Sequence, residues 1–134
     1  MALPDPKQTL WPECGIARFL KLMDGPWATL VVRELLPGPR RFTGLRRALP
    51  GISAHTLTNR LRQFEAYGIV TRTVYAEVPP RVEYQLTDVG LRLRTVLEAM
   101  DEWASTVPLV EGEDAVPLPA SCETPRMREI APAL

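Results

Sequence analysis

Polar side chains that can hydrogen-bond to nucleic acid lie along one side of segment 53–67. Leu57, Leu61 and Phe64 recur at helical spacing, and the opposite side is polar, with His55, Asn59, Arg62 and Gln63. Amide, imidazole and guanidinium groups hydrogen-bond to base edges and phosphates, so this pattern is typical of a helix that reads DNA. The solvated face of an ordinary amphipathic helix has the same composition. The function of this segment therefore depends on the elements around it.

The residue inventory does not indicate an enzyme or a metalloprotein. The chain of 134 residues has one His and two Cys, and it lacks a glycine-rich phosphate-binding loop. The histidine, His55, lies on a predicted helix without a matching nucleophile and carboxylate pattern. We expect no enzymatic activity, no catalytic residue, no metal site and no cofactor.

Helices and a hairpin are predicted around segment 53–67 from the spacing of apolar residues. The expected elements are helices at 16–23, 26–36, 43–49 and 53–67, strands at 70–75 and 82–86, and a last helix at 87–105. Thr43, Ser53 and Thr87 are predicted N-caps, and Pro79-Pro80 predicts the loop between two half-buried strands. This order is that of a winged helix-turn-helix. The predicted fold class is mainly α with a small β-wing, with extra N- and C-terminal helices for dimerisation.

Composition divides the chain into three expected parts. Residues 1–13 are predicted to be an N-terminal arm, 14–105 the winged helix-turn-helix domain, and 106–134 a proline-rich acidic tail. No apolar run approaches the roughly 20 residues that span a bilayer, and residues 1–11 lack the apolar region of a secretion signal. A cytoplasmic protein without a membrane partner is therefore expected.

Charge is segregated along the chain, although the formal net charge is zero. Residues 14–86 hold eleven Arg and Lys against five Asp and Glu, whereas residues 87–134 hold four against nine. The basic part coincides with the predicted helix-turn-helix and wing. Phosphate binding depends on local charge, so the neutral total does not exclude a nucleic-acid partner.

Several short motifs recur in a specific order. They are Cys14, Trp27, Arg33-Glu34-Leu35, Gly38-Pro39-Arg40-Arg41-Phe42, Leu49-Pro50-Gly51-Ile52-Ser53, Leu57-Thr58-Asn59-Arg60-Leu61, Tyr75, Pro79-Pro80-Arg81-Val82-Glu83-Tyr84 and Leu86-Thr87. Together they closely resemble the HxlR-type family of bacterial winged helix-turn-helix transcriptional regulators, over residues 14 to about 103. The resemblance implies a sequence-specific DNA-binding regulator, expected to be a repressor rather than an activator.

Three residues depart from that family pattern. Pro26 and His55 stand where the family commonly has Lys, and Gly44 stands where an acidic residue is common. Pro26 and Gly44 leave the expected fold unchanged. His55 replaces a permanent cation with a titratable group at the front of the predicted recognition helix, which bears on base preference and affinity.

The resemblance makes segment 53–67 the recognition helix that enters the major groove. We expect His55, Thr56 and Asn59 to contact base edges, because the major groove presents a distinct pattern for each base pair. Phosphate contacts or structural pairs are expected for Ser53, Thr58, Arg60 and Arg62, and a backbone clamp for Arg40, Arg41, Arg46 and Arg47.

The wing carries two further basic candidates. Arg81 is expected to reach DNA, with pairing to Glu77 or Glu83 as the alternative. For Arg72 the two interpretations are equally supported.

The last predicted helix carries an apolar stripe formed by Leu93, Leu97, Met100 and Trp103. A small winged helix seldom buries a long terminal helix by itself, and DNA readers of this kind work as dimers on palindromic sites. We therefore predict a homodimer built on residues 87–105 and the first helix.

Cys14 is the candidate for sensor chemistry. In several members of the resembled family a cysteine at the matching position responds to oxidants or electrophiles, which requires a thiolate stabilised by positive charge such as that of Arg18. The alternative is a small buried thiol that packs in the dimer interface. Cys122 lies outside the resemblance, and its pairing with Cys14 is a further alternative.

The expected partners are double-stranded DNA, a second copy of the chain, and an oxidant or small-molecule effector. A winged helix can also serve as a protein-protein interaction module without specific DNA binding. A third interpretation is a small-ligand regulator with a pocket between the terminal helix and the winged domain.

Overall fold

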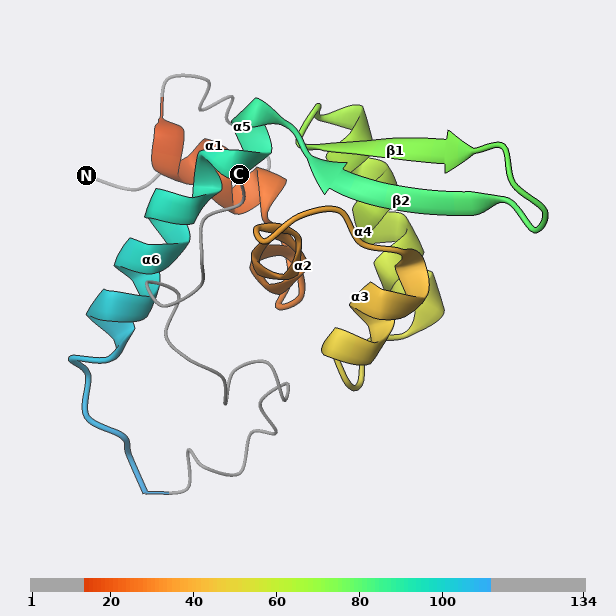
Figure 1. Cartoon of the computed structure of the whole chain (residues 1–134). Coiled ribbons are helices and arrows are strands. Elements are labelled where there is room, and N and C mark those ends of the chain that lie inside the picture. Colours follow the sequence, from red (N-terminus) through yellow and green to blue (C-terminus); the bar gives the residue numbers. More distant parts are fainter. Residues whose placement is uncertain (1–13, 112–134) are drawn as a thin grey trace.

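The computed structural model describes residues 14–111, which fold as helices around one side of a two-stranded antiparallel sheet (Figure 1). The elements are α1 (Gly15–Leu22), α2 (Ala28–Leu35), α3 (Phe42–Ala48), α4 (Ala54–Ala66), β1 (Val70–Tyr75), β2 (Arg81–Leu86), α5 (Asp88–Leu91) and α6 (Leu93–Ala104). The predicted fold class is confirmed: α3 and α4 form the helix-turn-helix, and β1 and β2 form the wing. The predicted arm, most of the predicted tail and Cys122 lie outside the described residues.

Two of the three predicted helix caps are confirmed. The Ser53 hydroxyl accepts from the backbone N–H of Thr56 at 3.0 Å, and the Thr87 hydroxyl accepts from that of Gly90 at 3.2 Å. The prediction for Thr43 is wrong, because α3 begins one residue earlier, after an extended Arg41 that makes no side-chain cap. The strand-like pairing of Arg40 with Tyr84 keeps the chain extended up to that point.

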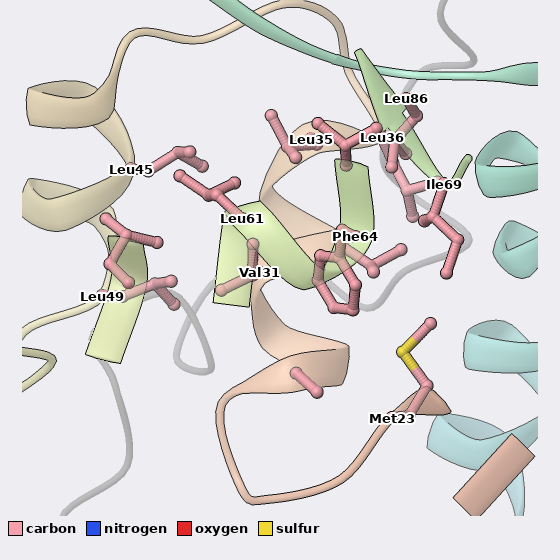
Figure 2. Packing of buried hydrophobic residues seen from close by; sticks show 14 of the residues in the cluster. Met23, Val31, Leu35, Leu36, Leu45, Leu49, Leu61, Phe64, Ile69 and Leu86 are labelled. Atoms are coloured by element: carbon pink, nitrogen blue, oxygen red, sulfur yellow. The ribbon is translucent and has the colours of Figure 1, made fainter. Parts of the chain in front are cut away.

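The apolar core lies where α2, α3 and α4 meet the base of the hairpin (Figure 2). Leu61 from α4 lies beside Leu45 from α3 and Val31 from α2, Phe64 lies toward Ile69, and all of these side chains are buried. Each fully buried side chain of this size stabilises the fold by about 1.5–3 kcal/mol. Among residues 14–111, no polar or charged residue is buried.

The wing is buried only at its base. Val70 pairs with Leu86 at the base of the hairpin and Tyr75 pairs with Arg81 at its far end. Val70 and Leu86 are buried, whereas the rest of β1 is exposed. The expectation of two half-buried strands therefore holds for most of β2 and fails for β1, because the hairpin projects past the helices and no layer covers its outer part (Figure 1).

The predicted last helix is divided at Arg92 into α5 and α6. Gly90 in α5 packs directly on the end of β2 and on the residue that precedes β1. A Cβ added at Gly90 would collide with the carbonyl oxygen of Ile69 and come within 2.9 Å of Leu86 Cδ2. This joint between the wing and the terminal helix therefore has room only for glycine.

Gly90→Ala should lower the free energy of unfolding by about 1–3 kcal/mol, because the new methyl group overpacks the joint. Gly44→Ala is the matched control, since Gly44 lies in α3 with nothing within 4 Å of an added Cβ, and it should be neutral or stabilising by up to about 1 kcal/mol. Urea unfolding followed by circular dichroism measures both. Equal midpoints for Gly90→Ala and the wild type would contradict the close packing.

Candidate nucleic-acid interface

The exposed side of α4 carries the residues predicted to read bases. His55, Asn59 and Arg62 are exposed, on the side opposite the buried Leu57 and Phe64. Residues at intervals of three or four share a side of a helix. The orientation of α4 about its axis that buries the apolar side therefore also exposes the polar side. The structure brings these predicted residues together on one surface.

Asn59 and His55 are joined by a hydrogen bond of 3.1 Å between Asn59 Nδ2 and His55 Nε2. An amide nitrogen can only donate, so this contact uses one of the two N–H groups of Asn59. Asn59 keeps one N–H donor and its carbonyl oxygen for another partner. That combination matches the N6 and N7 edge of adenine in the major groove.

Ser53 and Thr56 are tied to each other at the start of α4. The Ser53 hydroxyl donates to Thr56 Oγ1 at 2.9 Å and accepts from the Thr56 backbone N–H. The Ser53 oxygen thus caps the helix, and Thr56 Oγ1 keeps its own proton for another acceptor. Thr58 is half-buried on the flank of α4.

The basic residues around α3 divide into two kinds. Arg41, Arg46 and Arg47 are exposed, and the last two line a shallow open depression together with Thr43. Arg40 is anchored instead: its backbone pairs with Tyr84, and its Nη1 lies 3.8 Å from Glu34 Oε2. Three of the four arginines predicted for a phosphate clamp are therefore exposed and form no ion pair within residues 14–111.

Arg81 forms its contacts within the wing, as the alternative of pairing had it, and a contact with DNA stays a prediction. Its guanidinium lies 3.9 Å above the centre of the Tyr75 ring, and it forms ion pairs with Glu77 and Glu83, both at 3.2 Å. The pairing interpretation is the one that the geometry supports. Its sequence signal was the spacing of Glu77 and Glu83 around Arg81. Arg72, on the opposite strand, is exposed and makes no ion pair within residues 14–111.

Arg60 also turns away from the polar face of α4. Its side chain is half-buried, and its guanidinium lies over the turn between α1 and α2, beside Gly25. From the sequence, Arg60 and Arg62 were both expected to form phosphate contacts or structural pairs. The structure separates them, because only Arg62 shares the exposed face with His55 and Asn59.

The residues predicted for a dimer interface also separate into two kinds. Leu97 is buried within the chain and Leu93 packs against the same core. Met100 and Trp103 are 44% and 70% exposed. Leu93 and Leu97 pack within the chain because α6 lies against α2.

Helix α1 has a similar exposed apolar side. Ile16 and Leu20 are 76% and 63% exposed, whereas Met23, at helical spacing from both, is buried. The helix is short, and Phe19 and the following Met23 meet the core. Sequence periodicity signals an apolar face, but not whether the chain itself covers it.

Cys14 immediately precedes α1 and is a free, half-buried cysteine. Its carbonyl oxygen accepts the first hydrogen bond of the helix, from Arg18 N at 3.0 Å. The side chain of Arg18 is exposed on the next turn. Cys14 therefore lies at the start of the helix that exposes Ile16 and Leu20.

Other kinds of site are not found in the described part of the chain. Residues 14–111 contain no group of three or more His, Cys, Asp or Glu side chains arranged to hold a metal ion. None of the helices in the same range is long and apolar enough to cross a membrane.

The arrangement of α3, α4 and the wing defines a winged helix-turn-helix protein. The model of the HxlR-like helix-turn-helix family matches residues 22–109. The chain belongs to this family, as its motifs had indicated.

Relatives of the chain are transcriptional regulators. An HTH-type transcriptional regulator of Synechocystis is 51% identical over 92 residues, which cover 69% of this chain and 68% of the relative. The HTH-type regulator YybR of Bacillus subtilis is 37% identical over 103 residues, covering 75% of this chain and 82% of YybR.

Solved structures similar to this chain include two redox-related regulators. The redox regulator HypR in its oxidised form is 38% identical with a TM-score of 0.66, covering 72% of this chain and all of that one. The reduced form of the regulator YodB from B. subtilis is 34% identical with a TM-score of 0.63, covering 69% of this chain and 92% of that one.

Proposed function

We propose that the protein is a sequence-specific regulator of transcription that places α4 in the major groove of duplex DNA. The observation that carries this proposal is the polar face of α4, where the Asn59 amide is oriented by His55 opposite the buried Leu57 and Phe64. The relatives support it, because they are HTH-type transcriptional regulators.

Roles on DNA follow from the exposure of each side chain. His55, Thr56 and Asn59 are assigned to base edges. Phosphate contacts are assigned to the residues with exposed or flanking polar groups, namely Thr58, Arg62, Arg41, Arg46, Arg47 and, from the wing, Arg72. Ser53 serves mainly as the cap of α4, and Arg40 and Arg81 serve the fold through their ion pairs.

Asn59→Ala should weaken binding to the specific operator by about 1–3 kcal/mol, roughly 5–150-fold in Kd, because one bidentate base contact is lost. Non-specific binding should change little. The measurement is gel retardation or fluorescence anisotropy with duplexes from the promoter region of the protein's own gene, and repression is checked by transcription in vitro from that promoter.

Thr95→Ala is the control, because Thr95 is exposed on α6, away from α4. It should bind the operator as the wild type does. The absence of any salt-sensitive retardation by the wild type would refute DNA binding and leave the protein-protein interaction module as the function. Equal operator affinities for Asn59→Ala and the wild type would refute the assigned role of α4.

We further infer that the regulator is a homodimer on a palindromic operator and acts as a repressor. The support is the exposed apolar surface of α1 and α6, formed by Ile16, Leu20, Met100 and Trp103. Exposed apolar patches of this kind usually mark interaction surfaces. A two-fold dimer reads two half-sites about 34 Å apart, one helical turn, and a protein seated there obstructs transcription.

Trp103→Glu should weaken the dimer by about 2 kcal/mol or more, roughly 30-fold in its dissociation constant, because it places a charge in an apolar contact. Sedimentation velocity over a dilution series measures this. Val78→Glu at the tip of the wing is the matched control, since Val78 is fully exposed and far from α6 in the fold, and it should leave the mass unchanged. A monomeric wild type at micromolar concentration would contradict the homodimer.

We also propose that Cys14 makes the regulator responsive to oxidants. Cys14 is a free thiol at the start of α1, and α1 also supplies part of the proposed dimer surface. HypR is a redox regulator, and a structure of diamide-treated YodB is among the similar structures. Oxidation at this position would alter the packing of α1 and so the dimer.

Cys14→Ser should bind the operator as the wild type does under reducing conditions and should lose any response to diamide. The wild type should change its affinity after diamide and recover with dithiothreitol. Cys122→Ser shows whether the second cysteine is needed. An unchanged wild-type affinity after diamide would leave Cys14 as a packing residue.

A further inference from the structure

The turn that joins α1 to α2 touches the recognition helix through Arg60. Gly25 in this turn has a φ of +88°, and a Cβ added there would lie 2.9 Å from Arg60 Nη2 and 3.9 Å from Arg60 Cζ. The guanidinium thus fills the space that a side chain at position 25 would occupy. The backbone angle at position 25 favours glycine, and the absence of a side chain there leaves the space that the Arg60 guanidinium occupies.

The position of Arg60 on α4 explains this contact. Arg60 follows the buried Leu57 by three residues and precedes the buried Phe64 by four, so it lies on the flank of the inward face. Its Nη1 donates to Gln63 Oε1 at 3.0 Å, and its Nε is buried without a partner among the described residues. The side chain is therefore directed along the protein surface toward α1 and not outward with Arg62.

The same turn makes a second contact with the helix-turn-helix. The ring of Trp27 lies beside Gly51, in the turn between α3 and α4, with Cη2 and Cζ2 at 3.8 and 3.9 Å from the Cβ position of Gly51. Trp27 also packs against the core. Residues 25–27 thus touch both the turn that precedes the recognition helix and the second turn of that helix.

We propose that Arg60 is a positioning residue that fastens α4 to the turn between α1 and α2, and that it makes no contact with DNA. Together with Trp27, it sets where the recognition helix lies relative to α1. This role rests on the proposed function for its effect on operator affinity. It also connects the turn that follows α1 to the helix proposed to read bases.

The salt dependence of DNA binding separates a positioning residue from a phosphate contact. Each phosphate contact adds about 0.9 to the slope of log Kd against log salt for duplex DNA. Arg60→Met should weaken operator binding by tenfold or more at every salt concentration with the slope unchanged. Arg62→Met, the matched variant on the exposed face, should lower the slope by about 0.9.

Two results would overturn the proposal. A slope lowered by about 0.9 for Arg60→Met would make Arg60 a phosphate contact. Wild-type affinity for Arg60→Met would show that the contact with Gly25 has no influence on α4. Circular dichroism and the thermal midpoint establish that each variant is folded before its affinity is compared.

A double-mutant cycle tests the contact itself, with Gly25→Ala made in the wild type and in Arg60→Ala. The loss of operator affinity caused by Gly25→Ala should be at least threefold smaller when Arg60 is absent, because the steric conflict is then removed. Gly68→Ala is the control, since Gly68 has a φ of +72° and nothing within 4 Å of an added Cβ. It should add to Arg60→Ala without coupling.

Additive effects of Gly25→Ala and Arg60→Ala would overturn the proposal. The same cycle is read in thermal midpoints, so it remains decisive if the wild type binds no duplex or if Arg60→Met does not fold. In the first case the proposed function fails, while coupled midpoints for positions 25 and 60 would still establish that Arg60 fastens α4.

Discussion

The burial of Leu57, Leu61 and Phe64 fixes the rotation of α4 about its own axis, and the rest of the interface depends on that rotation. Each of these side chains contributes about 1.5–3 kcal/mol by leaving water. Turning the helix by one residue, about 100°, would expose at least one of them. A single hydrogen bond to a base edge contributes less than that loss, so the polar face is set by the core before DNA is met.

The arginines of this protein fall into two groups, one exposed on the surface and one paired with carboxylates within the chain. Arg41, Arg46, Arg47 and Arg62 present exposed guanidinium groups, whereas Arg40 and Arg81 pair with carboxylates. Because two carboxylates surround Arg81, the far end of the wing carries a local excess of negative charge. The positive surface therefore lies over α3 and α4, and the wing contributes Arg72 from the middle of β1.

The order of elements could be predicted from the sequence because each element has a local signal. Ser53 and Thr87 precede helices as hydroxyl caps, and the interval between Leu57, Leu61 and Phe64 identifies the inward face of α4. The polar face of α4 follows from the same periodicity, which is why His55 and Asn59 were placed together.

The partners of the long cationic side chains could not be predicted in the same way. Arg60 and Arg81 have several rotatable bonds, and their partners are chosen by tertiary geometry: a glycine in a distant turn for one, a ring and two carboxylates for the other. The sequence does not determine what covers Ile16 for a related reason. Spacing identifies an apolar face, but whether anything covers it depends on how far a neighbouring element extends.

Thr87 connects the end of the helix-turn-helix to the start of the terminal helices. Its hydroxyl donates to the carbonyl oxygens of Gly68 and Ile69 at 2.6 and 3.2 Å, and its backbone N–H donates to Ile69 at 3.0 Å. The C-terminal end of α4 and the beginning of α5 are thereby clamped together. In the proposed homodimer, the short α5 links α6 to the wing, so its length and direction would set the distance between the two recognition helices and the spacing of the proposed half-sites.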